Sequence, residues 1–161
     1  MENPNFTNQK DGVGVIVEPP ILFLAFLILG IALRFIIKFP IFSQSSVGYA
    51  AGGLLIILGV FLAGWAIKTF KKLGETPHHG NPIHKIIASG PFQFTRNPMY
   101  LSMISIYIGL GLIINTYWPL LFLPLMLIIL HYGVILREEE YLEKKFKEEY
   151  LSYKLKVGRW L

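Results

Sequence analysis

Four long apolar runs constrain the fold of this chain more than any other feature. They cover residues 21–37, 47–67, 98–114 and 118–136. Each is close to the ~20 residues that an α-helix needs to cross the ~30 Å hydrocarbon core of a bilayer. A soluble domain of 161 residues would also have too little interior for a chain that is 53% hydrophobic and only 16% charged. We therefore predict an all-α integral membrane bundle of about four transmembrane helices, with residues 1–161 forming a single membrane domain.

The segments before and between these runs are more polar and predict connections. Residues 1–18 show no apolar period, so we expect a loose N-terminal segment. Residues 68–97 contain prolines, glycines and histidines, and they predict a loop with short helical pieces. Residues 115–117 form a link that is too short to cross the membrane, so the third and fourth runs should form a helical hairpin. The second run is rich in glycine and alanine, which predicts close packing against other helices.

The chain ends in a charged segment, residues 137–161, that has a helical pattern. Apolar residues recur there at every third or fourth position, which predicts one amphipathic helix on the cytosolic side. We interpret it as a helix that lies at the membrane interface and also covers a site. The apolar positions are Leu142, Phe146, Tyr150, Tyr153, Val157 and Trp160.

Basic residues are distributed unevenly along the chain, whose formal net charge is +5. Lysines and arginines cluster in residues 68–96 and 137–159, whereas the opposite side has little beyond Lys38. The positive-inside rule then places both termini and the central loop in the cytoplasm. This distribution favours contact with anionic headgroups over nucleic acid. Arg34, one turn before Lys38, is expected to snorkel toward the interface.

A metal site is not expected. The chain has no cysteine, which excludes disulfides, thiolate metal sites and cysteine nucleophiles. The histidines of the central loop, His78, His79 and His84, match no familiar zinc spacing.

A first cluster of possible functional residues precedes the third run. Asn97 followed by Pro98 predicts a helix start, with asparagine as the N-cap and proline at the first helical position. Helix N-termini attract anions, and Arg96 adds a positive charge with a planar fork, while Tyr100 lies on roughly the same face. The plainer interpretation is a capped helix with a snorkelling arginine and an interfacial tyrosine. From the residues alone, this plainer interpretation is favoured.

A second cluster lies at the end of the fourth run. A histidine within an apolar span, here His131, usually faces the bundle interior and is a functional candidate. Ile135 and Glu138 share its helical face at spacings of four and three, and Glu139 follows. The alternatives are a packing histidine and a solvated face of glutamates.

Together, these segments resemble the isoprenylcysteine carboxyl methyltransferase and phospholipid methyltransferase superfamily, especially its small prokaryotic members. The resemblance covers roughly residues 70–161, and the first two spans match by hydrophobicity alone. The matching elements are His84 with Ile86 to Phe92, Arg96 to Tyr100, Arg137 to Glu139 with Tyr141 and Leu142, Phe146, Glu149 with Tyr150, Tyr153, and the ending Val157 to Leu161.

The resemblance implies S-adenosylmethionine as methyl donor and a lipophilic acceptor within the bilayer of a prokaryotic cell membrane. It implies that Arg96, Asn97, Glu138 and Glu139 are the catalytic residues. The cofactor pocket that it implies consists of His84, Lys85, Ile86, Ile87, Phe92, Arg96, Asn97, Tyr100, His131 and Glu138. An acceptor carboxylate would need no general base, whereas an amine would need one, with Glu138, Glu139 or His131 as candidates.

The chain departs from the eukaryotic isoprenylcysteine enzymes at two positions. Val134 stands where those enzymes carry a substrate-contacting arginine, and Asn97 stands where they carry a histidine. The acceptor therefore stays open among an isoprenylcysteine-like carboxylate, a phospholipid amine and another membrane-soluble molecule. Lys147 replaces a common family glycine at an expected helix turn.

Two other classes of protein remain as alternatives. One is an NADPH-dependent membrane reductase, because sterol reductases have a related C-terminal architecture. The other is a non-catalytic scaffold or transporter subunit. Binding of S-adenosylmethionine, NADPH or neither would separate the three classes.

Overall fold

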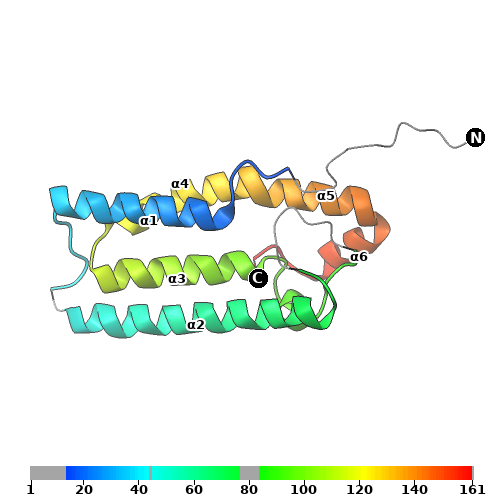
Figure 1. The fold of residues 1–161 in the computed structure, drawn as a ribbon, viewed down its shortest axis with the longest axis horizontal. Helices are drawn as coiled ribbons and strands as arrows, with labels where there is room; N and C mark the ends of the chain where they lie inside the picture. The colour runs from blue at the N-terminus through cyan, green and yellow to red at the C-terminus, as the bar shows by residue number, and fades with distance from the viewer. Residues whose placement is uncertain (1–13, 44, 77–83, 161) are drawn as a thin grey trace, which may run out of the picture.

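The protein is a bundle of apolar helices that run alongside one another (Figure 1). The computed structural model describes residues 14–43, 45–76 and 84–160. In this part of the chain the long helices are α1 (Pro19–Ile36), α2 (Ser45–Lys72), α3 (Pro98–Ile114) and α4 (Trp118–Leu130). The smaller elements are the 3-10 helix η1 (Gly90–Gln93), the π-helical turn η2 (His131–Ile135), α5 (Leu136–Phe146) and α6 (Glu148–Lys156). The prediction of an all-α fold is confirmed for the described residues.

The helices have the length and composition of membrane spans. Three segments are long and apolar enough to cross a membrane, namely α1, α2 and the continuous helix Trp118–Phe146, and α3 is a shorter apolar helix of 17 residues. Large apolar side chains such as Ile57, Phe61 and Ile128 point outward and are more than half exposed. Such a surface is costly in water and favourable in lipid. The protein is therefore a multi-pass membrane protein.

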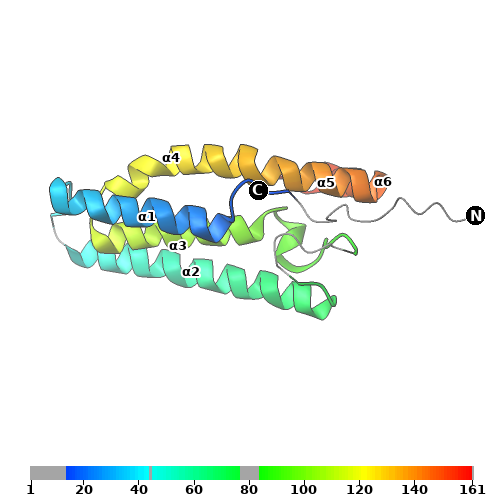
Figure 2. The same cartoon turned by 45° about the horizontal axis from the view of Figure 1, so that its top comes forward.

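Helix α3 lies between α2 on one side and the pair α1 and α4 on the other, as both views show (Figures 1 and 2). Proline occupies the first turn of α1, α3 and α4, where its missing N–H costs nothing. Helix α2 is 28 residues long, ~42 Å at 1.5 Å per residue, and it extends past the apolar run to Lys72. Lys71 and Lys72 lie in its last turn, where cations stabilise the negative end of the helix dipole.

Glycines bring the backbones of α2 and α3 into direct contact. A Cβ atom added to Gly52 would lie 2.5 Å from the carbonyl oxygen of Gly109, and one added to Gly109 would lie 2.7 Å from the carbonyl oxygen of Gly52. The Ser105 hydroxyl donates a 2.7 Å hydrogen bond across the same interface to the carbonyl oxygen of Leu55. The small residues of α2 thus allow the close helix packing that the sequence predicts.

The side chain of Asn115 joins the two connections at one end of the bundle. Asn115 has a φ of 56° and ends α3 in the left-handed conformation that asparagine tolerates. Its Oδ1 atom accepts hydrogen bonds from the N–H groups of Ile41 and Phe42, and its Nδ2 atom donates to the Phe42 carbonyl. The connection from α1 to α2 is therefore held against the turn from α3 to α4.

A π-helical turn separates α4 from α5 within one continuous helix. Leu136 N–H donates to the carbonyl oxygen of His131, five residues earlier, instead of four as in an α-helix. The carbonyl oxygen of Gly133 accepts a 3.1 Å hydrogen bond from Ile16, which ties the segment before α1 to this turn. The shared face of His131, Ile135 and Glu138 was predicted for an unbroken α-helical register, which the structure does not keep.

The prediction of one continuous helix over residues 137–161 is wrong. Helix α5 continues α4 as far as Phe146, and Lys147 then adopts a φ of 46° that ends the helix. Helix α6 turns back from there, and the chain end returns to the start of α3 (Figure 1). The turn lies where the resemblance places a glycine, because a positive φ suits a residue without a Cβ atom.

Replacing Gly52 by alanine should destabilise the protein, whereas the same change at the neighbouring Gly53 should not. The Cβ atom at Gly52 would overlap the Gly109 carbonyl, while that at Gly53 meets nothing within 4 Å. We expect the thermal unfolding temperature of the detergent-purified Gly52→Ala protein to fall by several degrees, because overpacking costs roughly 1–3 kcal/mol. Equal unfolding temperatures for the two variants would contradict the close backbone contact.

Candidate functional site

The candidate site begins with an apolar wall formed by α2 and the segment that enters α3. The buried members of this wall are Ala66, Phe70, Ile87 and Phe92. The rings of Phe70 and Phe92 meet edge to face, with centroids 5.3 Å apart. The hydroxyl of Tyr153 on α6 donates a 2.7 Å hydrogen bond to the Phe92 carbonyl, which holds α6 against the wall. Burial raises the pKa of Tyr153, so the phenol stays a neutral donor.

The buried pair of Arg96 and Glu139 is the centre of the site. Arg96 lies just before α3, and its Nη1 atom is 3.0 Å from Oε1 of Glu139 on α5. The two side chains are only 8% and 7% exposed, so the charges are shielded from water. The Nε atom of Arg96 is also buried, and it has no hydrogen-bond partner among the described residues. Arg96 is therefore fixed in place and still has a donor to offer.

Glu139 is surrounded by three cations from separate segments. Arg159 donates two 2.8 Å hydrogen bonds to the two carboxylate oxygens, and Lys154 on α6 lies 3.8 Å away. The hydrogen bond to Glu139 raises the pKa of Arg159, which keeps the guanidinium charged. A carboxylate with these partners has little capacity left to accept a proton. The arrangement makes Glu139 a structural anchor and a poor general base.

The C-terminal segment is bound to the entry of α3 through backbone groups. The N–H of Arg96 donates a 3.0 Å hydrogen bond to the Gly158 carbonyl. The Thr95 hydroxyl and the Asn97 side-chain amide donate to the Arg159 carbonyl, at 3.1 and 2.9 Å. Asn97 occupies the N-cap position of α3, but its side chain makes no capping hydrogen bond. The predicted helix start, with Asn97 at the N-cap and Pro98 first in the helix, is confirmed, but the Asn97 amide holds the C-terminal segment instead of capping the helix.

Glu138 has a different environment from its neighbour Glu139. The hydroxyl of Tyr100, on the first turn of α3, donates a 2.8 Å hydrogen bond to Oε1 of Glu138. Tyr100 is 3% exposed and packs in the main core with Val134 and Ile135. Glu138 is half-buried. The Tyr100 hydroxyl is thus a neutral donor that orients Glu138, whereas Glu139 is neutralised by three cations.

Five of the residues implied by the resemblance are close together at one end of the bundle. They are Arg96, Asn97, Tyr100, Glu138 and Glu139, joined directly or through the C-terminal segment. Ile87 and Phe92 lie in the adjoining apolar wall, with Ile86 half-buried beside them in sequence.

In the described part of the chain, no hydrogen bond, ion pair or ring contact joins His84, Lys85 or His131 to this group. Lys85 is exposed, and so is the ring of His84, while the His84 N–H donates to the buried carboxylate of Glu75 at 3.1 Å. The ring of His131 packs edge to face on Tyr132, with centroids 4.9 Å apart.

Residues 77–83, which include His78 and His79, lie outside the described residues. Among the residues that are described, no group of three histidine, aspartate or glutamate side chains could hold a metal ion.

Sequence reasoning missed several residues of the site. Arg159, Lys154 and Tyr150 complete the surroundings of Glu139 and Arg96, and Glu75 binds the start of the segment that carries Ile87. Two of these residues, Arg159 and Tyr150, were indicated by the sequence, because they belong to the motifs that carry the family resemblance. Their pairing with Arg96 and Glu139 depends on the turn at Lys147.

The fold and the site define a multi-pass membrane protein with an ion-paired site at one end of an apolar bundle. A family model described as phospholipid methyltransferase matches residues 47–149, from the start of α2 to the start of α6. The chain therefore belongs to the phospholipid methyltransferase family.

Two further comparisons concern individual proteins. An uncharacterized protein of Haemophilus influenzae is 40% identical over 63 residues, which are 39% of this chain and 100% of that relative. No solved structure matches the chain.

Replacing Glu139 by glutamine should destabilise the protein far more than the same change at Glu140. Glu139→Gln leaves the buried Arg96 without a counter-charge, which typically costs about 3–5 kcal/mol. Glu140 is exposed, and its ion pair in the described part of the chain is with Lys144, so Glu140→Gln should change stability by less than about 1 kcal/mol. Thermal unfolding in detergent would measure both. A Glu139→Gln protein as stable as the Glu140→Gln protein would refute the anchoring role.

Proposed function

We propose that this protein is an S-adenosylmethionine-dependent methyltransferase that modifies a lipophilic acceptor within the membrane. The observation that carries the proposal is the combination of a fixed Arg96 with a buried unused donor and a Glu138 oriented by Tyr100. Arg96 is linked to the apolar wall at the end of the bundle, because Tyr150 contacts Arg96 and packs on Tyr153, whose hydroxyl donates to Phe92 of that wall. Membership in the phospholipid methyltransferase family supports the same reaction class.

The donor set fits the methionine end of the cofactor, which carries one carboxylate and one ammonium group. Arg96 would bind the carboxylate through its guanidinium, which Glu139 and Tyr150 hold in place. Glu138 would accept a hydrogen bond from the ammonium group or from the ribose hydroxyls. Ile87 and Phe92 would provide apolar contacts for the adenine. Arg96 thus recognises negative charge and Glu138 recognises positive charge.

S-adenosylmethionine supplies a methyl group on a positively charged sulfur. The chain has to align the acceptor with that methyl group and to exclude water, because the transfer is an in-line displacement. The C-terminal segment and α6 cover Arg96 and leave Tyr150 2% exposed, which supports a water-excluding role. The proposed roles of Arg96 and Glu138 are to hold the donor, and that of Tyr100 is to orient Glu138.

The acceptor that we propose is a phospholipid amine. Val134 is fully buried and apolar, so this position offers no cation to a substrate carboxylate. An amine acceptor needs a base for one proton, and Glu138 is the best of the three candidates. Glu139 is neutralised by its cations, and His131 has no hydrogen bond to the group around Arg96 in the described part of the chain. The distribution of basic residues further supports a cytoplasmic location for the site and for both termini.

Removal of Arg96 or Glu138 should weaken cofactor binding. We expect Arg96→Ala and Glu138→Gln to weaken binding of S-adenosylhomocysteine by at least tenfold, since each loses a charge-assisted hydrogen bond worth roughly 1.5–3 kcal/mol. Calorimetry on detergent-purified protein would measure this, with Glu148→Gln as a control at an exposed position.

Wild-type affinity in both variants would refute the site. Binding of NADPH by the wild-type protein, or of neither ligand by a folded sample, would instead favour a reductase or a non-catalytic protein.

The acceptor class predicts which substrate becomes methylated. With radiolabelled S-adenosylmethionine, we expect transfer to phosphatidylethanolamine in mixed micelles and none to a farnesylated cysteine analogue. The Glu138→Gln protein, saturated with cofactor, should transfer more slowly if Glu138 takes the proton. Methylation of the cysteine analogue alone would overturn the amine assignment and leave the cofactor assignment intact.

A further inference from the structure

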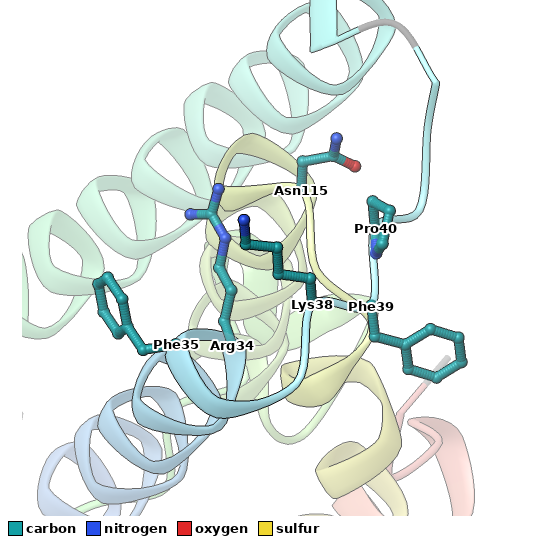
Figure 3. Close-up of a pocket in the computed structure, with 6 residues that line it drawn as sticks. All are labelled: Arg34, Phe35, Lys38, Phe39, Pro40 and Asn115. Carbon is teal, nitrogen blue, oxygen red and sulfur yellow. The ribbon is translucent and has the colours of Figure 1, made fainter.

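A basic hollow lies at the end of the bundle opposite Arg96. It has a volume of about 420 Å³ and is lined by residues from the end of α1 and from the turn after α3. The charged ends of Arg34 and Lys38 lie next to each other in this hollow, while the rings of Phe35 and Phe39 point away on either side (Figure 3). The full lining consists of Arg34, Phe35, Lys38, Phe39, Pro40 and Asn115.

The two cations have no counter-charge in the described part of the chain. Neither Arg34 nor Lys38 makes an ion pair with any described residue. The sequence has no acidic residue between Glu18 and Glu75, and none between Glu75 and Glu138. Glu18 precedes α1, Glu75 follows α2 and Glu138 is on α5, so these glutamates lie at the end of the bundle that carries Arg96 (Figure 1). An anion that pairs with these two exposed cations therefore has to come from outside the described protein.

The surroundings of the hollow are apolar, which identifies the source of the anion. Phe35, Ile36 and Ile37 are 82%, 76% and 54% exposed. The ring of Phe39 packs against those of Tyr117 and Trp118, with centroids 4.8 and 6.2 Å apart. Exposed apolar side chains beside clustered tyrosine and tryptophan are typical of the membrane interface. At the membrane interface, an anion that carries acyl chains is more favourable than a soluble anion, because its chains contact these exposed apolar side chains.

We propose that Arg34 and Lys38 bind the phosphate of an anionic phospholipid, in the leaflet opposite the candidate active site. The guanidinium plane of Arg34 suits two phosphate oxygens, and the ammonium group of Lys38 adds a point charge. Asn115 is not a ligand, because its side chain is used by Ile41 and Phe42. It lines the hollow and fixes the segment that follows Lys38. This site is separate from the proposed catalytic function and does not depend on it.

Lipid binding to matched charge variants tests the proposal. We would titrate phosphatidylglycerol and phosphatidylcholine into the detergent-purified full chain and measure bound lipid by native mass spectrometry. Arg34→Gln with Lys38→Gln should weaken phosphatidylglycerol binding roughly 30-fold, because each interfacial cation contributes about fivefold. Lys71→Gln with Lys72→Gln, which removes two cations from the other end of the bundle, should leave binding near the wild-type level.

Three results would overturn the proposal. They are equal loss in both double variants, no preference of the wild type for phosphatidylglycerol, and competition by inorganic phosphate at the lipid's own concentration. The last result would indicate a site for a soluble anion. The charge-preserving variant Arg34→Lys with Lys38→Arg should keep most of the binding, which separates loss of charge from loss of fold.

Discussion

The buried contact of Glu139 with Arg96 and Arg159 is the interaction on which the site depends. Asn97 and Arg159 are 62 residues apart in the chain, and Glu139 and Arg159 are 20 apart, yet all three belong to one connected group. Buried charges are costly unless each is paired and hydrogen-bonded. Glu139 meets that condition only when α5, the entry of α3 and the C-terminal segment are all in place. The ion cluster therefore makes the assembly of this end of the bundle cooperative.

Two adjacent glutamates show how the same side chain serves different purposes. Glu139 turns toward the cations and stabilises the fold, whereas Glu138 meets a tyrosine hydroxyl and stays half-buried. Their separation follows from the helix, since neighbouring residues lie on different faces. Glu139 holds Arg96 in place, so Glu138 is not needed for that purpose. This division supports the proposed binding of a ligand that carries both a carboxylate and an ammonium group.

Much of the fold follows from local signals in the sequence, and much of the site does not. The four apolar runs and the proline at the start of α3 are local features, and the structure has helices at all of them. The partners of Arg96 and Glu139 are non-local, since they depend on α6 folding back at Lys147. No pattern in the sequence indicated the π turn, because the same residues would also form an ordinary α-helix. The Asn97 side chain likewise makes a tertiary hydrogen bond to the Arg159 carbonyl, in place of a local bond that would cap α3.

The π turn at His131–Ile135 has a geometric consequence for the end of the molecule that carries Arg96. Each residue of an α-helix advances the side chains by about 100° around the axis. A turn that contains one extra residue therefore acts as a phase shift between the membrane-embedded half of the helix and its charged half. The apolar half can keep the register that packs Met126 and Leu130 in the core, while the charged half turns Glu138 toward Tyr100 and Glu139 toward Arg96. The two halves of one helix are thus free to satisfy two different sets of neighbours.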